Sequence, residues 1–143
     1  MKNNLFTQFL LCGIVGWSLE CFWTGLHSLF ILDPTLSCNT SLWMFPIYGL
    51  AAFTFPLYRK IAHLSFYIRG LLYTILMYFV EFTTGSFLKA FHACPWNYDQ
   101  APLQLCGLVR LDYAPLWFLS GLLFERLLVF MHSEKDYSQN LNK

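Results

Sequence analysis

The sequence predicts an all-α fold: a four-span transmembrane helix bundle, with an outer loop between spans three and four in which a small β-hairpin is plausible. Three observations lead to this class. The 143-residue chain is 57% hydrophobic and only 12% charged, whereas soluble domains carry about 25% charged residues. Aromatic residues make up 20% of the chain, and membrane proteins use such rings as interfacial anchors. Four apolar segments approach the roughly 20 residues that a spanning helix needs.

The four predicted spans cover about residues 5–32, 42–58, 70–91 and 114–131. They make up a single transmembrane domain, residues 1–132, followed by a cytoplasmic tail, residues 133–143. The first apolar run is longer than the roughly 7–15 residues of a signal-peptide core, so we expect it to remain as a span.

Polar and helix-breaking residues separate the predicted spans. Asp33 and Pro34 end the first, and a polar turn at 59–69 separates the second from the third. Pro46 and Pro56 are expected to kink the second helix, because proline cannot donate a backbone hydrogen bond.

The basic residues predict the orientation of the bundle. Four spans place both termini and the 59–69 turn on one side. Seven of the nine basic residues then lie on that side: Lys2, Arg59, Lys60, Arg69, Arg126, Lys135 and Lys143. Positively charged loops stay on the cytoplasmic side of a membrane. We therefore expect both termini in the cytoplasm, whichever membrane holds the chain.

The loop after the third span contains two short apolar arms that meet at Cys106-Gly107. Such arms suit a small β-hairpin, a re-entrant lid, or a plug that packs over the bundle. Cys38, Cys94 and Cys106 all fall on the outer side, where an oxidising compartment would allow two of them to form a disulfide. All three pairings remain open. The cysteine spacing does not resemble a zinc motif, so we expect no metal site.

Three of the eight acidic residues lie within predicted spans: Glu20, Glu81 and Glu125. A charge at the bilayer centre costs roughly 2.5–3.5 kcal/mol on insertion scales, so such residues turn away from lipid and mark functional sites by default. Glu20 and Glu81 are expected near the midplane, and Glu125 slightly to its cytoplasmic side. The three carboxyl groups could therefore meet at one level.

Helical spacing adds aromatic and hydroxyl side chains to the stripes that carry these acids. Trp17 shares a stripe with Glu20, Thr84 with Glu81, and Trp117 with Glu125. The functional interpretation is a ligand- or proton-binding site made of all six residues, with the tryptophan rings able to hold an organic cation. The structural alternative is interhelical hydrogen bonding, or pairing of each acid with Lys89, Arg69 or Arg126.

Several motifs carry a resemblance to known families. The segments EFTTG at Glu81–Gly85, ACPWNY at Ala93–Tyr98 and the stretch Gly107–Glu125 resemble the eukaryotic transmembrane protein 229 family. GWSLE at Gly16–Glu20 and FPIYG at Phe45–Gly49 resemble the bacterial putative ABC-transporter type IV permease family. Neither resemblance implies a settled activity. The chain lacks the nucleotide-binding G-x-x-x-x-G-K-[ST] pattern, so any ATPase would be a separate chain.

These observations predict a permease-like or small carrier subunit with a polar intramembrane site. The alternative is a non-transporting scaffold or assembly factor. We expect no enzymatic activity and no cofactor, because no nucleophile–base spacing appears. The expected partners are the lipid bilayer and a second copy of the chain or another membrane subunit. The net charge of +1 gives no reason to expect a nucleic-acid partner.

Overall fold

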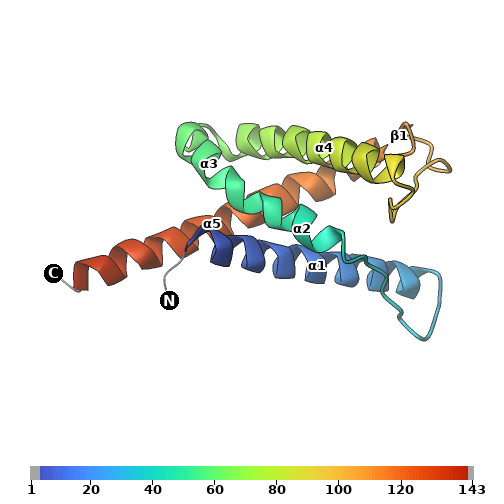
Figure 1. The fold of residues 1–143 in the computed structure, drawn as a ribbon, viewed down its shortest axis with the longest axis horizontal. Coiled ribbons are helices and arrows are strands. Elements are labelled where there is room, and N and C mark those ends of the chain that lie inside the picture. The colour runs from blue at the N-terminus through green and yellow to red at the C-terminus, as the bar shows by residue number, and fades with distance from the viewer. Residues whose placement is uncertain (1–3, 142–143) are drawn as a thin grey trace. The chain divides into compact units, whose positions relative to one another are not determined.

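The computed structural model describes residues 4–141 and is mostly helical (Figure 1). Its elements are α1 (Leu5–Phe30), α2 (Met44–Gly49), η1 (Leu50–Thr54), α3 (Phe55–Ile61), α4 (Phe66–Ala90), β1 (Gln104–Leu105), β2 (Val109–Arg110), η2 (Leu111–Tyr113) and α5 (Ala114–Leu141). The described chain forms two compact units. The first contains the residues up to Phe55 and those from Leu128, and the second contains Pro56–Leu127.

Helix α1 is the longest element of the first unit. Asn4 caps it, since its side chain accepts a hydrogen bond from the Thr7 N–H at 2.8 Å. The helix ends at Phe30, just before Leu32, which has a positive φ of 60°, and the Asp33-Pro34 pair. Helix α2 packs along α1. The close approach requires Gly16, because a Cβ there would overlap the ring of Tyr48.

The second predicted span is an interrupted helix. α2, η1 and α3 run without a gap from Met44 to Ile61, with a 3₁₀ stretch at Leu50–Thr54. The physical reason is Pro56. It has no N–H for an i−4 carbonyl, so it is best accommodated in the first turn of a new helix that starts at Phe55.

The other three predicted spans are long apolar helices. Leu5–Phe30, Phe66–Ala90 and Leu111–Ser133 are each long and apolar enough to cross a membrane. α4 begins four residues before the predicted Gly70, directly after Ser65 at the N-cap position. α5 begins at Ala114 as predicted and continues through the predicted tail to Leu141.

The faces of α4 have the polarity of a membrane helix. Its buried positions are mostly small or polar: Gly70, Tyr73, Thr74, Gly85 and Leu88. Its exposed stripe is apolar: Leu71, Ile75, Phe79 and Phe82. A soluble protein rarely exposes such a continuous apolar surface, which indicates that lipid covers this face.

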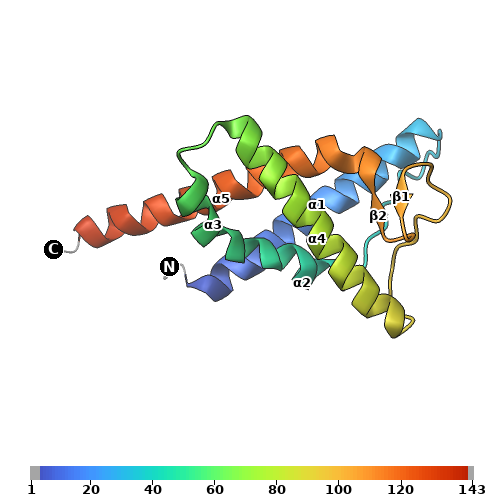
Figure 2. The same ribbon diagram turned by 90° about the horizontal axis from the view of Figure 1, so that it is seen from above.

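The loop between α4 and α5 holds the predicted β-hairpin. β1 and β2 pair antiparallel with Gln104 opposite Arg110 and Leu105 opposite Val109, as seen beside the start of α5 in Figure 2. The turn needs residues that tolerate positive φ, and Cys106 and Gly107 have φ of 56° and 68°. The hairpin prediction is confirmed.

Candidate functional site: the intramembrane carboxyl groups

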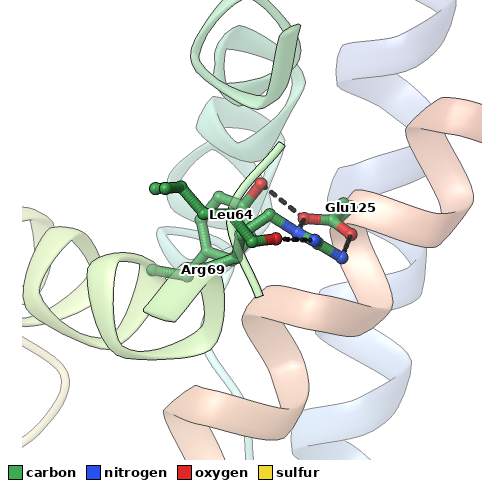
Figure 3. A network of polar contacts seen from close by, with 4 residues as sticks. Leu64, Arg69 and Glu125 are labelled. Atoms are coloured by element: carbon green, nitrogen blue, oxygen red, sulfur yellow. Dashed lines mark hydrogen bonds and ion pairs between the residues drawn. The ribbon is translucent and has the colours of Figure 1, made fainter. Parts of the chain in front are cut away.

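Glu125 is the best-satisfied of the three acids. Its side chain is 2% exposed and accepts two hydrogen bonds from Arg69, from Nε at 2.9 Å and from Nη2 at 3.0 Å. The Tyr73 hydroxyl donates a third at 2.8 Å. Figure 3 shows the guanidinium of Arg69 between Glu125 and the backbone of Leu64, to whose carbonyl Nη1 donates at 2.6 Å. This bidentate pair therefore joins α4 to α5 and fixes the turn before α4.

The packing around Glu125 is as tight as its hydrogen bonding. Gly121 lies one turn before it on α5, and a Cβ at this position would overlap the Cβ of Tyr73. Glycine thus allows α5 to approach α4 closely enough for the tyrosine hydroxyl to reach the carboxylate.

Glu81 lies in the same unit, but its carboxyl group is less fully hydrogen-bonded than that of Glu125. The side chains of Tyr98, from the loop, and Trp117, from α5, lie beside its carboxyl group. Tyr98 and Trp117 are both hydrogen-bond partners of this carboxyl group. However, neither the buried Oε2 of Glu81 nor the buried Nε1 of Trp117 makes a hydrogen bond of regular geometry among the described residues. The indole donor and the carboxyl acceptor therefore face each other in a poorly aligned contact, which is uncommon because incompletely satisfied buried groups cost stability.

Glu20 belongs to the first unit and is partly satisfied. The Thr40 hydroxyl donates to its Oε2 at 3.0 Å, and the side chain of Tyr48 from α2 is a second partner. Trp17, one turn earlier, packs edge-to-face on Phe45 with ring centroids 6.1 Å apart. The indole Nε1 of Trp17 is buried and has no hydrogen-bond partner among the described residues.

The structure brings some of the predicted site residues together and separates others. Glu81 and Trp117 lie side by side, although helical spacing had assigned Trp117 to Glu125. Within α4, Arg69 and Glu81 are twelve residues apart, or about 18 Å, so the carboxyl groups of Glu125 and Glu81 have separate partners at different levels. Thr84 donates to the Val80 carbonyl at 2.6 Å on its own helix.

The outer loop contributes the residues that sequence reasoning missed. Tyr98 reaches Glu81, and the Trp96 indole donates to the Leu108 carbonyl at 2.9 Å, which ties the hairpin to the loop. Tyr73 was also missed as a partner of Glu125. Its position, four residues after Arg69 on the same helix face, was the available signal.

The cysteine thiols and the side chains that could bind a metal ion were also candidates for a site. Cys38, Cys94 and Cys106 are free thiols, as are Cys12 and Cys21. Among residues 4–133, whose side chains the structure describes, no group of three or more His, Cys, Asp or Glu side chains is arranged to hold a metal ion.

Comparison with known proteins gives the family. No solved structure matches the chain. A family model described as "Putative ABC-transporter type IV" matches residues 7–142, nearly the whole sequence. The match includes the GWSLE and FPIYG segments and agrees with the three apolar helices long enough to cross a membrane. The chain is therefore an integral membrane protein that belongs to the putative ABC-transporter type IV family.

Proposed function

We propose that the chain crosses the membrane four times, with α2, η1 and α3 as the second crossing. These elements have a contour length of about 30 Å, which matches the hydrocarbon core of a bilayer. Arg59 and Lys60 lie in the last turn of α3, where they would meet the cytoplasmic surface. An even number of crossings would place both termini on the same side, and the basic residues on that side favour the cytoplasm. Lys2 and Lys143, two of the seven basic residues assigned to the cytoplasmic side, lie outside the described residues.

We further propose that the chain is a permease-like subunit that binds a small solute at Glu81. The single observation behind this is the buried carboxyl group of Glu81, whose Oε2 and whose neighbour Nε1 of Trp117 make no hydrogen bond of regular geometry. A carboxylate oxygen accepts hydrogen bonds and an indole N–H donates one. The matching solute carries an N–H or O–H donor, and a positively charged donor group would suit the carboxylate best.

The three acids have different roles in this proposal. Glu81, with Trp117, Tyr98 and Thr84 nearby, forms the binding site. Glu125 is held by Arg69 and serves as a structural link rather than a relay. Glu20 and Trp17 form a second polar region whose one unpartnered atom is a donor. We propose a non-enzymatic role without a cofactor, with a second copy or another membrane subunit completing the path and any ATPase on a separate chain.

The binding proposal is tested with two ammonium probes on the purified chain in detergent. Methylammonium has N–H donors, and tetramethylammonium has the same charge without them. Tryptophan fluorescence titration should show that Glu81→Gln weakens methylammonium binding about ten- to a hundredfold, the equivalent of one charge-assisted hydrogen bond. Trp17→Phe is the matched control and should bind like the wild type. Equal affinity of Glu81→Gln and wild type for methylammonium would refute the proposed site.

A scaffold or assembly function is the second candidate, and the Arg69–Glu125–Tyr73 network favours it. Interhelical hydrogen bonds of this kind hold membrane helices together without any transported solute. Under this function, Glu81→Gln would leave all solute binding unchanged, and a stable partner would co-purify with the wild type. Membership of the transmembrane protein 229 family, suggested by the EFTTG and ACPWNY segments, stays a prediction and carries no part of either candidate.

A further inference from the structure

The loop segment 37–40 lies along the second half of α1 in antiparallel direction, held by side chains of the helix. The Ser28 hydroxyl donates to the Ser37 carbonyl at 2.7 Å. The Thr24 hydroxyl accepts from the Asn39 N–H at 3.0 Å. Thr40 donates to Glu20 at 3.0 Å. Hydrogen bonds on both sides of Cys38 therefore fix its position along the helix.

This position places Cys38 over the helix stripe that contains Cys21. Gly25 is one turn after Cys21, and a Cβ at Gly25 would lie 3.7 Å from the Cβ of Cys38. The thiol of Cys21 lies beside the thiol of Cys38. Cys38 is exposed, whereas Cys21 is half-buried. An incoming reagent would therefore meet Cys38 first.

We propose that Cys21 and Cys38 form an intrachain disulfide when the chain meets a disulfide oxidant such as glutathione disulfide or an oxidised dithiol protein. The Cys38 thiolate attacks the oxidant, forms a mixed disulfide and releases one thiol. The Cys21 thiolate then displaces the second thiol and completes the bond. The protein loses two protons and two electrons, and the oxidant is reduced to two thiols.

The bond would hold the loop segment 37–40, including Thr40, on Glu20. It would exclude two of the three pairings left open by the sequence, Cys38–Cys94 and Cys38–Cys106, and is compatible with the third, Cys94–Cys106. Since α1 carries both Cys21 and Glu20, the redox state of the thiols would control how firmly Thr40 stays on the carboxylate. The inference does not rest on the proposed solute site.

The test treats the purified full-length chain with glutathione disulfide, blocks free thiols with a maleimide, and analyses unreduced peptides by mass spectrometry. A peptide joining Cys21 to Cys38 is expected, and a reductant should release it. Cys94→Ser and Cys106→Ser are the matched controls and should form the same bond. In Cys21→Ser, oxidant-treated Cys38 should remain as a glutathione mixed disulfide.

Two outcomes would overturn the inference. One is a peptide joining Cys38 to Cys94 or Cys106. The other is Cys38 that reacts with maleimide to the same extent before and after oxidation. Cys38→Ser, on an exposed loop, provides a second variant if Cys21→Ser folds poorly. It should leave Cys21 unlinked and the maleimide reactivity of Cys94 and Cys106 unchanged.

Discussion

Glu125 and Glu81 are two carboxyl groups in one unit with opposite surroundings. Glu125 has a guanidinium and a tyrosine hydroxyl arranged around it, and its hydrogen bonds are all 2.8–3.0 Å long. Glu81 faces an indole and a tyrosine from a loop, and its Oε2 makes no hydrogen bond of regular geometry among the described residues. The difference teaches that an acid within a span does not by itself mark a site. A better mark of a binding site is a buried acid whose hydrogen bonds are incomplete.

The largest expected effect is the loss of the cation that neutralises Glu125. Arg69→Met should lower the free energy of unfolding by roughly 3–5 kcal/mol, because it leaves an unpaired charge on a side chain that is only 2% exposed. Thermal unfolding in mild detergent, or titration with a denaturing detergent, measures the loss. The double variant Arg69→Met/Glu125→Leu should recover most of it. A single variant as stable as the wild type would show that the pair contributes nothing to the fold.

A smaller loss in the free energy of unfolding is expected when a side chain is added at the contact between α4 and α5. Gly121→Ala should cost about 1–3 kcal/mol, since the new methyl group would overlap Tyr73 and shift its hydroxyl from Glu125. Gly25→Ala is the matched control. Its nearest neighbours would be the Leu36 carbonyl at 3.5 Å and Cys38 at 3.7 Å, which are ordinary contacts. The same unfolding measurement should give a near-neutral or slightly stabilising result for the control.

The comparison is sharpest when both acids receive the same change. Glu81→Gln should alter the free energy of unfolding by less than about 1 kcal/mol, because no cation loses its partner there. Glu125→Gln should cost about 1.5–3 kcal/mol, the value of a hydrogen bond to a charged group. Equal losses in parallel unfolding experiments would mean that Glu81 is as firmly paired as Glu125, and would remove the argument for a binding site.

The smallest expected effect concerns the exposed loop after α1. Asp33 accepts hydrogen bonds from the Thr35 N–H at 2.9 Å and from its hydroxyl at 2.8 Å, and these lower the pKa of Asp33. A lowered pKa stabilises the folded state above the unfolded-state pKa of about 3.9, and the effect disappears as pH falls through the folded-state value. Wild type and Asp33→Asn should therefore differ slightly in melting temperature at pH 6, and the difference should shrink as pH falls through the lowered pKa of Asp33. A difference that grows on acidification would contradict this assignment.

Much of the fold follows from the apolar composition of the sequence and from its helix-breaking and turn residues. The apolar runs predicted the starts of three long helices within four residues, although α5 continues ten residues past the predicted end at Met131. The Cys106-Gly107 pair predicted the hairpin turn. Ser65 gave a start signal for α4 that the apolar pattern alone placed at Gly70. Pro56 was recognised as a disturbance of the second helix, but the 3₁₀ form of the preceding residues depends on how the backbone absorbs that disturbance. Sequence spacing does not determine this.

The candidate site was less predictable, because its partners come from distant segments. Helical spacing groups residues on one helix, whereas Glu81 meets a loop tyrosine and a tryptophan from α5. The loop residue Tyr98 had no periodic pattern to place it. Arg69 was one of several basic residues that could neutralise an acid, and the three-dimensional structure was needed to show that it pairs with Glu125.

The distance along the chain between Arg69 and Glu125 has a consequence for biosynthesis. The two residues are 56 positions apart, so at about 5–20 residues per second the ribosome needs roughly 3–11 seconds to deliver the glutamate after the arginine. During that interval α4 has the guanidinium of Arg69 in its first turn without its counter-ion. Such a side chain can extend toward the headgroups while it waits. Closure of the α4–α5 pair is therefore a late event in membrane insertion, and a chain truncated before Glu125 would leave α4 without its anchor.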